Sequence, residues 1–61
     1  MKFADQLKSE RERLGLTRAG AAAILQDVTA SWIDKAESGL RVPHVWMQAE
    51  ALRRLREQKT P

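Results

Sequence analysis

Two apolar helical patterns separated by a very short turn constrain the fold of this chain more than any other feature of its sequence. Apolar residues repeat at helical spacing over residues 18–25, and the same spacing resumes over residues 30–38. Only the four residues Gln26-Asp27-Val28-Thr29 separate the two patterns. A chain that breaks one helix for so short a turn and then begins another favours a second helix that is presented to a partner.

The first half of the chain predicts two helices. Phe3, Leu7 and Leu14 lie on one face of the first helix, and Gly15, a residue that tolerates positive φ, ends it. Thr17 is a good N-cap for the second helix, which covers residues 18–25 and is rich in alanine. Such small side chains allow another helix to approach closely.

The second half predicts two more helices. Thr29 caps a helix over residues 30–38 that stops at Gly39, and Pro43 suits the first turn of a last helix over about residues 43–58. This last helix has two apolar stripes. We expect the first to face the domain core: Val45, Ala49 and Leu52. The second points roughly 100–120° away from it. Its members are Met47, Ala51 and Leu55.

The length of the chain predicts a single small domain that is short of core. A chain of 61 residues is marginally stable alone, and disulfides, a metal or a partner usually help at this size. There is no cysteine, and His44 is the only histidine, so we expect no disulfide and no metal site. A second copy of the chain is the simplest stabiliser, with the stripe Met47, Ala51 and Leu55 as the dimer interface.

The charge of the chain permits a polyanionic partner without establishing one. The net charge is +3, but residues 1–50 hold seven basic and seven acidic side chains. The excess therefore lies in Arg53, Arg54, Arg56 and Lys59 against Glu57. A basic last turn also complements the dipole of its own helix.

Other functional classes are not expected. The sequence has no apolar run of about 20 residues and no signal peptide at its start, so we expect a cytoplasmic protein without membrane contact. It has no set of histidine, carboxylate and nucleophile, and no phosphate-binding loop. We therefore expect no enzymatic activity, no cofactor and no small-molecule ligand.

The helix over residues 30–38 has a polar face suited to DNA. Trp32, Ile33 and Ala36 share one arc of a helical wheel, which assigns Trp32 to packing against the last helix. The opposite arc carries short or flexible side chains: Ala30, Ser31, Asp34, Lys35 and Ser38. A face of this kind fits the major groove of B-DNA, where serine and lysine reach base edges and alanine meets a thymine methyl. The alternative is an ordinary solvated helix face.

The ordered set of motifs resembles the phage repressor/Cro-type helix-turn-helix family, also called XRE-like. The matching residues, in chain order, are Leu7, Arg11, Gly15-Leu16-Thr17, Ala22, Leu25, Val28-Thr29, Ile33, Glu37-Ser38-Gly39 and Arg41-Val42-Pro43. The resemblance covers about residues 3–55. It implies an all-α, compact four- to five-helix lambda-repressor-like DNA-binding domain over residues 1–61, with its helix-turn-helix unit at about 17–38.

The chain departs from the family pattern at three places. Glu10 and the small Ala36 stand where the family has larger apolar residues, and Gln26-Asp27 replaces a single glycine, which lengthens the turn. The longer turn bears directly on the tilt of the helix that follows it.

The resemblance and the helix termini together suggest residue roles. The resemblance implies an ion pair between Arg11 and Glu37, and it places Arg41 at the DNA backbone, although an ordinary loop arginine is the alternative. Free N–H groups and the dipole at a helix start attract phosphate. The residues expected at the DNA backbone are Thr17, Arg18, Thr29, Ser38 and Arg41. The residues expected to read bases are Ala30, Ser31, Asp34 and Lys35. The position of Trp46 stays open between core, interface and solvent.

These features predict a sequence-specific DNA-binding transcription regulator, of the kind found in phages and mobile elements. We expect a homodimer that binds a palindromic operator in double-stranded DNA. Repression by promoter occlusion, with its own operon as one target, is the simplest action for a chain with no room for a sensing domain. The alternative is a protein-interaction module, such as an antitoxin or a phage-encoded inhibitor that covers a partner protein.

Overall fold

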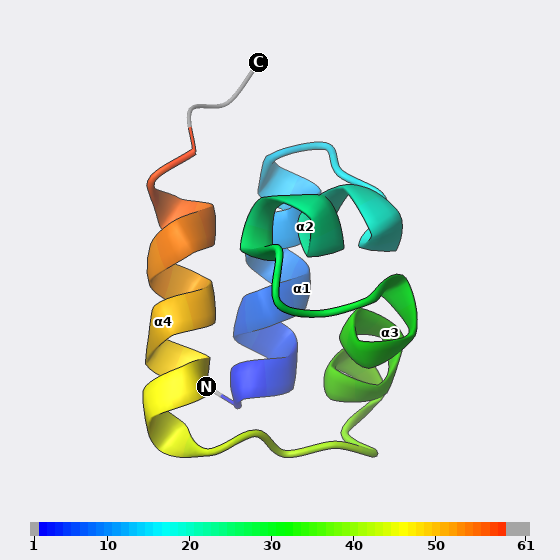
Figure 1. Ribbon diagram of the computed structural model, residues 1–61, viewed down its shortest axis with the longest axis vertical. Helices are drawn as coiled ribbons and strands as arrows, with labels where there is room; N and C mark the ends of the chain where they lie inside the picture. The colour runs from blue at the N-terminus through cyan, green and yellow to red at the C-terminus, as the bar shows by residue number, and fades with distance from the viewer. Residues whose placement is uncertain (1, 59–61) are drawn as a thin grey trace.

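Four helices build the chain in the computed structural model, which describes residues 2–58. They are α1 (Phe3–Arg13), α2 (Arg18–Leu25), α3 (Ala30–Ser38) and α4 (Val45–Arg56). α1 and α4 run side by side, α2 packs against α4 and α3, and α3 packs against α1 (Figure 1). The described part of the chain is therefore all-α, which confirms the predicted fold class.

The predicted caps and glycines define the helix boundaries. The hydroxyl of Thr17 accepts a hydrogen bond from the Gly20 N–H at 3.0 Å, and that of Thr29 accepts one from the Trp32 N–H at 3.1 Å. Gly15 has a φ of +68° and Gly39 a φ of +83°, a backbone region that favours glycine. α2 and α3 consequently occupy the residues that their sequence patterns predicted.

The core is small and is shared by all four helices. Its buried members are Leu7, Leu14, Ala21, Ala22, Leu25, Ile33, Ala36, Ala51 and Leu55. Leu7, Ile33 and Leu55 are its largest fully buried side chains, and they come from three different helices. Trp32, which we predicted to pack against the last helix, is partly buried against this shared core.

The last helix begins two residues later than the proline predicted. His44 has an extended backbone, so Pro43 lies outside the helix and α4 begins at Val45. The Nδ1 atom of His44 accepts a hydrogen bond from the Trp46 N–H at 3.4 Å, which makes His44 the N-cap. The helix ends at Arg56, somewhat before the predicted end near residue 58.

The assignment of the two stripes of α4 was wrong for most of their members, although Leu52 is buried, as predicted. Ala51 is 6% exposed and Leu55 is fully buried inside the monomer, so neither side chain is available to a second copy. Val45, expected in the core, is 71% exposed, and Ala49 is exposed as well. The two stripes lie about 100° apart on one helix, and α4 turns Ala51 and Leu55 toward the other helices, whereas Met47 remains half-buried at the edge.

Candidate nucleic-acid interface

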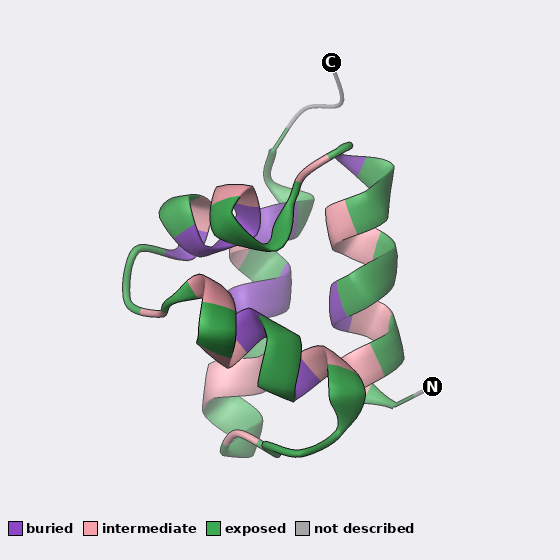
Figure 2. Ribbon diagram, turned by 90° about the vertical axis from the view of Figure 1, so that its right-hand side faces the viewer, coloured by how far each residue is buried: buried purple, intermediate pink, exposed green. Residues whose placement is uncertain are grey.

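α3 presents a continuous polar face on the outside of the molecule. Ile33 and Ala36 are buried beneath the helix at 0% and 1% exposure, whereas Ser31, Asp34 and Lys35 are exposed on its other side. Ala30 lies half-buried at the first position of the helix. The side of α3 that faces the viewer in Figure 2 is mostly exposed. The four residues predicted to read bases therefore lie on or beside one accessible surface.

An ion pair ties the end of this helix to α1. The Nε atom of Arg11 lies 2.7 Å from Oε2 of Glu37, and Nη2 donates to Oε1 at 3.1 Å. A third donor of Arg11, Nη1, reaches the carbonyl of Leu16 at 2.9 Å. The side chains of Arg11 and Glu37 are only 13% and 4% exposed. The ion pair that the resemblance implied is therefore present, and the hydrogen bond that Arg11 donates to Glu37 raises the pKa of Arg11.

Arg18 extends this cluster onto the outer surface. Its Nε atom lies 3.4 Å from Oδ1 of Asp34 and 3.8 Å from Oε1 of Glu37. The side chains of Arg18 and Asp34 are 49% and 62% exposed, so solvent screens the contact between them. Two residues predicted for different roles, backbone contact and base reading, therefore contact each other across α2 and α3.

The remaining residues predicted at the DNA backbone lie at the ends of α2 and α3. Thr17 and Thr29 are exposed N-caps whose hydroxyls already accept from their own helices. The hydroxyl of Ser38 donates to the carbonyl of Lys35 at 3.1 Å, in the last turn of α3. Arg41 is exposed just beyond this turn, where its backbone N–H donates to the same carbonyl at 3.2 Å.

The basic end of α4 is neutralised within the fold. Its pairs are Arg53 with Glu50 and Glu57, Arg54 with Glu50 and Asp27, and Arg56 with Glu10. Lys59 lies outside the described residues. Lys35 and Arg41 form no ion pair within residues 2–58, so these two cations near α3 are better placed to meet a polyanion than the arginines of α4.

The structure explains why Glu10 can stand where the family pattern has an apolar residue. The side chain of Glu10 is 18% exposed, and its carboxylate lies 2.9 Å from Nε of Arg13 and 3.6 Å from Nε of Arg56. A carboxylate stands here in place of an apolar residue because arginines of α1 and α4 compensate its charge.

Sequence reasoning missed an exposed apolar segment next to α3. Its members, with their exposed fractions, are Leu40 at 82%, Val42 at 79%, Val45 at 71% and Trp46 at 66%. Trp46 also borders an apolar groove between α3 and α4, lined by Val28, Trp32 and Met47 among others. A signal was present in the sequence, because Leu40 and Val42 are apolar residues in a connector and belong to no helical stripe.

Comparison with known families identifies the chain at the level of its fold. A family model described as a helix-turn-helix domain matches residues 2–56. Comparison with curated proteins and with solved structures gave no match. Among residues 2–58, no three metal-ligating side chains come together, and no helix has the length and apolar character that crossing a membrane requires.

Proposed function

Because this chain belongs to the helix-turn-helix domain family, a family of DNA-binding domains, we propose that it is a sequence-specific transcription regulator. α3 is the recognition helix, the helix that enters the major groove, and α2 lies across the DNA backbone. The observation that carries this proposal is the exposed polar face of α3, which combines short side chains with a lysine that has no ion pair among residues 2–58.

The chemistry of the α3 face matches the edges of bases. Lys35 can donate to the acceptors of guanine, and the hydroxyl of Ser31 can donate or accept. The methyl of Ala30 can contact that of thymine, and Asp34 can accept from the cytosine amino group. The face points away from the core, because Ile33 and Ala36 hold the opposite side of the helix against it.

Contacts to phosphate surround this face. The first N–H groups of α2 lie beside Thr17 and Arg18, where unpaired donors and the helix dipole favour an anion. Thr29 and Ser38 lie at the two ends of α3, and Arg41 follows it in the loop. These contacts position the protein on the duplex without reading its sequence.

The exposed apolar segment supports a homodimer whose interface differs from the predicted stripe on α4. Leu40, Val42, Val45 and Trp46 directly follow the recognition helix in the chain, and monomers rarely leave such a cluster in solvent. A two-fold contact between two copies of this segment places two recognition helices on one side of the DNA, as a palindromic operator with half-sites about 34 Å apart requires. Such a dimer represses by covering a promoter, with its own operon as one candidate.

Selection from a pool of random double-stranded DNA tests the reading face. The parent protein should enrich one sequence, and Lys35→Ala and Ser31→Ala should each weaken binding to that sequence by about 1–3 kcal/mol. Binding to a scrambled duplex should change less. Lys8→Ala, at an exposed position of α1, is the matched control and should leave the preference unchanged. Parent-like binding by both variants, with unchanged circular dichroism, would contradict the assignment.

The residues at the phosphates should respond differently. Arg18→Ala and Arg41→Ala should weaken binding to the selected and the scrambled duplex alike, because phosphates carry no sequence information. The slope of log affinity against log salt should fall by about 1 for each phosphate that the variant no longer neutralises. A variant that loses sequence preference with an unchanged salt slope would show that the residue reads bases.

A protein-interaction module is the second candidate, and the exposed apolar segment is the observation that favours it. If the pool yields no enriched sequence while substitutions in this segment abolish binding to a partner protein, that candidate replaces the first.

A further inference from the structure

We propose that Arg54, on α4, is a positioning residue for the recognition helix: its guanidinium holds the turn between α2 and α3 in a strained conformation that sets the direction of α3. The proposal rests on the proposed function, because it gives sequence reading a determinant that is remote from the reading face. The DNA-binding assignment itself does not depend on it.

The turn begins with a conformation that side chains rarely adopt. Gln26 has a φ of +67° and a ψ of −33°. The Asp27 N–H donates to the carbonyl of Leu25 at 2.8 Å, which closes a γ-turn around Gln26. The positive-φ form of this turn is rare and strained, and a residue with a Cβ remains in it only when its surroundings hold it there. Something in the fold must therefore hold this turn.

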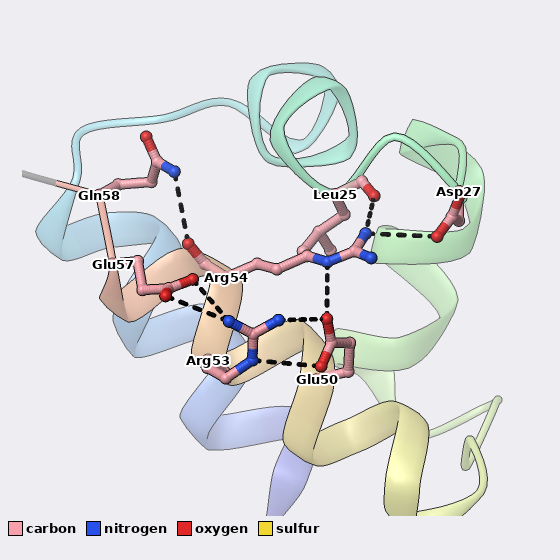
Figure 3. Close-up of polar contacts among 7 residues, drawn as sticks. All are labelled: Leu25, Asp27, Glu50, Arg53, Arg54, Glu57 and Gln58. Atoms are coloured by element: carbon pink, nitrogen blue, oxygen red, sulfur yellow. Dashed lines mark hydrogen bonds and ion pairs between the residues drawn. The ribbon is translucent and has the colours of Figure 1, made fainter.

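Arg54 supplies the contacts that hold it. Its Nη1 atom donates to the carbonyl of Leu25 at 2.6 Å and contacts Oδ2 of Asp27 at 3.2 Å (Figure 3). The carbonyl of Leu25 thus accepts two hydrogen bonds, one that closes the γ-turn and one from α4. Arg54 therefore contacts both neighbours of Gln26, Leu25 and Asp27. The strained φ and ψ of Gln26 determine how these two residues are oriented relative to each other.

Glu50 orients the guanidinium from the other side. Its Oε1 atom accepts from Nε of Arg54 at 3.0 Å, one turn earlier on α4. Glu50 also binds Arg53, which in turn reaches Glu57, and neither contact involves the turn (Figure 3). The chain therefore contains its own control: Arg53 and Arg54 share one carboxylate, but only Arg54 contacts the α2–α3 turn.

The turn directly controls the direction of the recognition helix. Only Val28 and the N-cap Thr29 separate Asp27 from the first residue of α3. The ion pair of Arg11 and Glu37 holds the other end of α3, so Arg54 and Arg11 fix the helix at its two ends. Contacts to base edges require placement within about 0.5 Å and 10–20°, so a small rotation at Gln26 changes which bases are read.

The first test measures the turn without DNA. Amide hydrogen exchange by NMR should show faster exchange at the Asp27 N–H in Arg54→Met, which keeps the apolar stem of the side chain but removes the guanidinium and its donors. Chemical shifts should change from Asp27 to Trp32. Arg53→Met should change neither. Asp27→Ala, at a side chain that is 74% exposed, should give a smaller shift of the same amides in a protein that folds normally. Identical Asp27 exchange in the parent and both methionine variants would overturn the proposal.

The second test measures sequence reading. On the duplex selected by the parent protein, Arg54→Met should lower the preference over a scrambled duplex about ten-fold, a change of about 1.4 kcal/mol. Arg53→Met should keep the preference of the parent. If Arg54→Met changes the amide exchange of the turn but keeps the preference for the selected duplex, the positioning role is overturned. A parent protein without any preference would instead refute the proposed function, and the exchange experiment would still decide whether Arg54 holds the turn.

A rescue distinguishes positioning from the removal of a charge. Glycine adopts positive φ without strain, so Gln26→Gly should restore much of the preference to the Arg54→Met protein. Gln26→Ala should restore none, because alanine retains a Cβ. If the double variant that combines Gln26→Gly with Arg54→Met reads DNA no better than Arg54→Met alone, turn strain is overturned as the reason for the effect.

Discussion

At the residue scale, partly buried arginine–carboxylate contacts determine how the helices meet. The side chain of Glu37 is almost enclosed, and its carboxylate accepts hydrogen bonds from two nitrogens of Arg11 while Arg18 lies nearby. Glu50 has a more open position on α4, where it joins two arginines of its own helix. The consequences of removing these two carboxylates should therefore differ.

Glu37→Gln should lower the free energy of unfolding by about 1–3 kcal/mol, since it leaves the guanidinium of Arg11 largely enclosed without a counter-charge. Thermal or urea denaturation followed by circular dichroism measures the change. Glu57→Gln is the control. Its carboxylate is 60% exposed and pairs with Arg53 on the surface, so its removal should cost less than about 0.5 kcal/mol. Equal losses of unfolding free energy for the two substitutions would show that the enclosed Arg11–Glu37 pair stabilises the fold no more than a surface pair does.

Glu50 should make the free energy of unfolding depend on pH in the acidic range. Hydrogen bonds from Arg53 and then Arg54 lower the pKa of Glu50 below its ordinary value. A carboxylate with a lowered pKa in the folded state contributes stability above its ordinary pKa and loses it as pH falls through the folded pKa. Glu50→Gln should therefore be less stable than the parent near pH 7, and the difference should shrink below about pH 4. Urea denaturation across this pH range measures the difference in stability between the two proteins. A difference that stays constant with pH would show that the lowered pKa of Glu50 is not its cause.

At the element scale, α2 and α3 act as one unit with its own internal electrostatics. Arg18 at the start of α2 contacts Asp34 on the exposed polar face of α3. In the unbound protein this contact draws the guanidinium toward the carboxylate, and the carboxylate itself repels phosphate. If the proposed function holds, we expect Asp34 to favour selectivity over affinity.

Asp34→Ala should strengthen binding to scrambled DNA and steepen its salt dependence by about one unit of slope, because Arg18 becomes available to a phosphate. The preference for the selected sequence should fall at the same time. Glu12→Ala, which removes a charge from an exposed position of α1, controls for net charge. If both substitutions raise affinity equally, the effect comes from total charge and not from the Arg18–Asp34 contact.

At the scale of the whole molecule, a small core and an exposed apolar segment lie in one chain. The principal dimensions are only 29 × 19 × 19 Å, and the segment Leu40, Val42, Val45 and Trp46 is largely exposed. A second copy that covers this segment adds apolar burial to a domain that is marginal by size. In the proposed dimer, this contact also brings together the two copies of α3 that reading of a palindromic site needs.

The double substitution Leu40→Gln and Val42→Gln should dissociate the dimer while the monomer stays folded, since both side chains are outside the core. Sedimentation equilibrium over a range of concentrations measures the association. Ala23→Gln, an apolar-to-polar change at an exposed position of α2, should leave it unchanged. A parent protein that remains monomeric at tens of micromolar and binds a single half-site tightly would contradict the dimer.

Local features of the sequence determined the elements of this protein. Thr17, Thr29, Gly15 and Gly39 act on their immediate neighbours, so the end of α1, the start of α2 and both ends of α3 follow from them without knowledge of the fold. The polar face of α3 also follows, because helical periodicity alone separates it from the buried face. The Arg11–Glu37 contact was predicted only through the resemblance to a family, since nothing local connects residues so far apart in the chain.

Tertiary packing decided which apolar residues of α4 are buried, because helical periodicity alone did not distinguish its two apolar stripes. α4 has two apolar stripes of similar character, and only its placement against the other helices determined that Leu55 is buried and Val45 exposed. The role of Arg54 is of the same kind. Its partners Leu25 and Asp27 lie 29 and 27 residues away in sequence, and a positive φ at Gln26 contradicts the local preference of that residue. Contacts between distant segments hold such conformations, and those contacts exist only once the helices have packed.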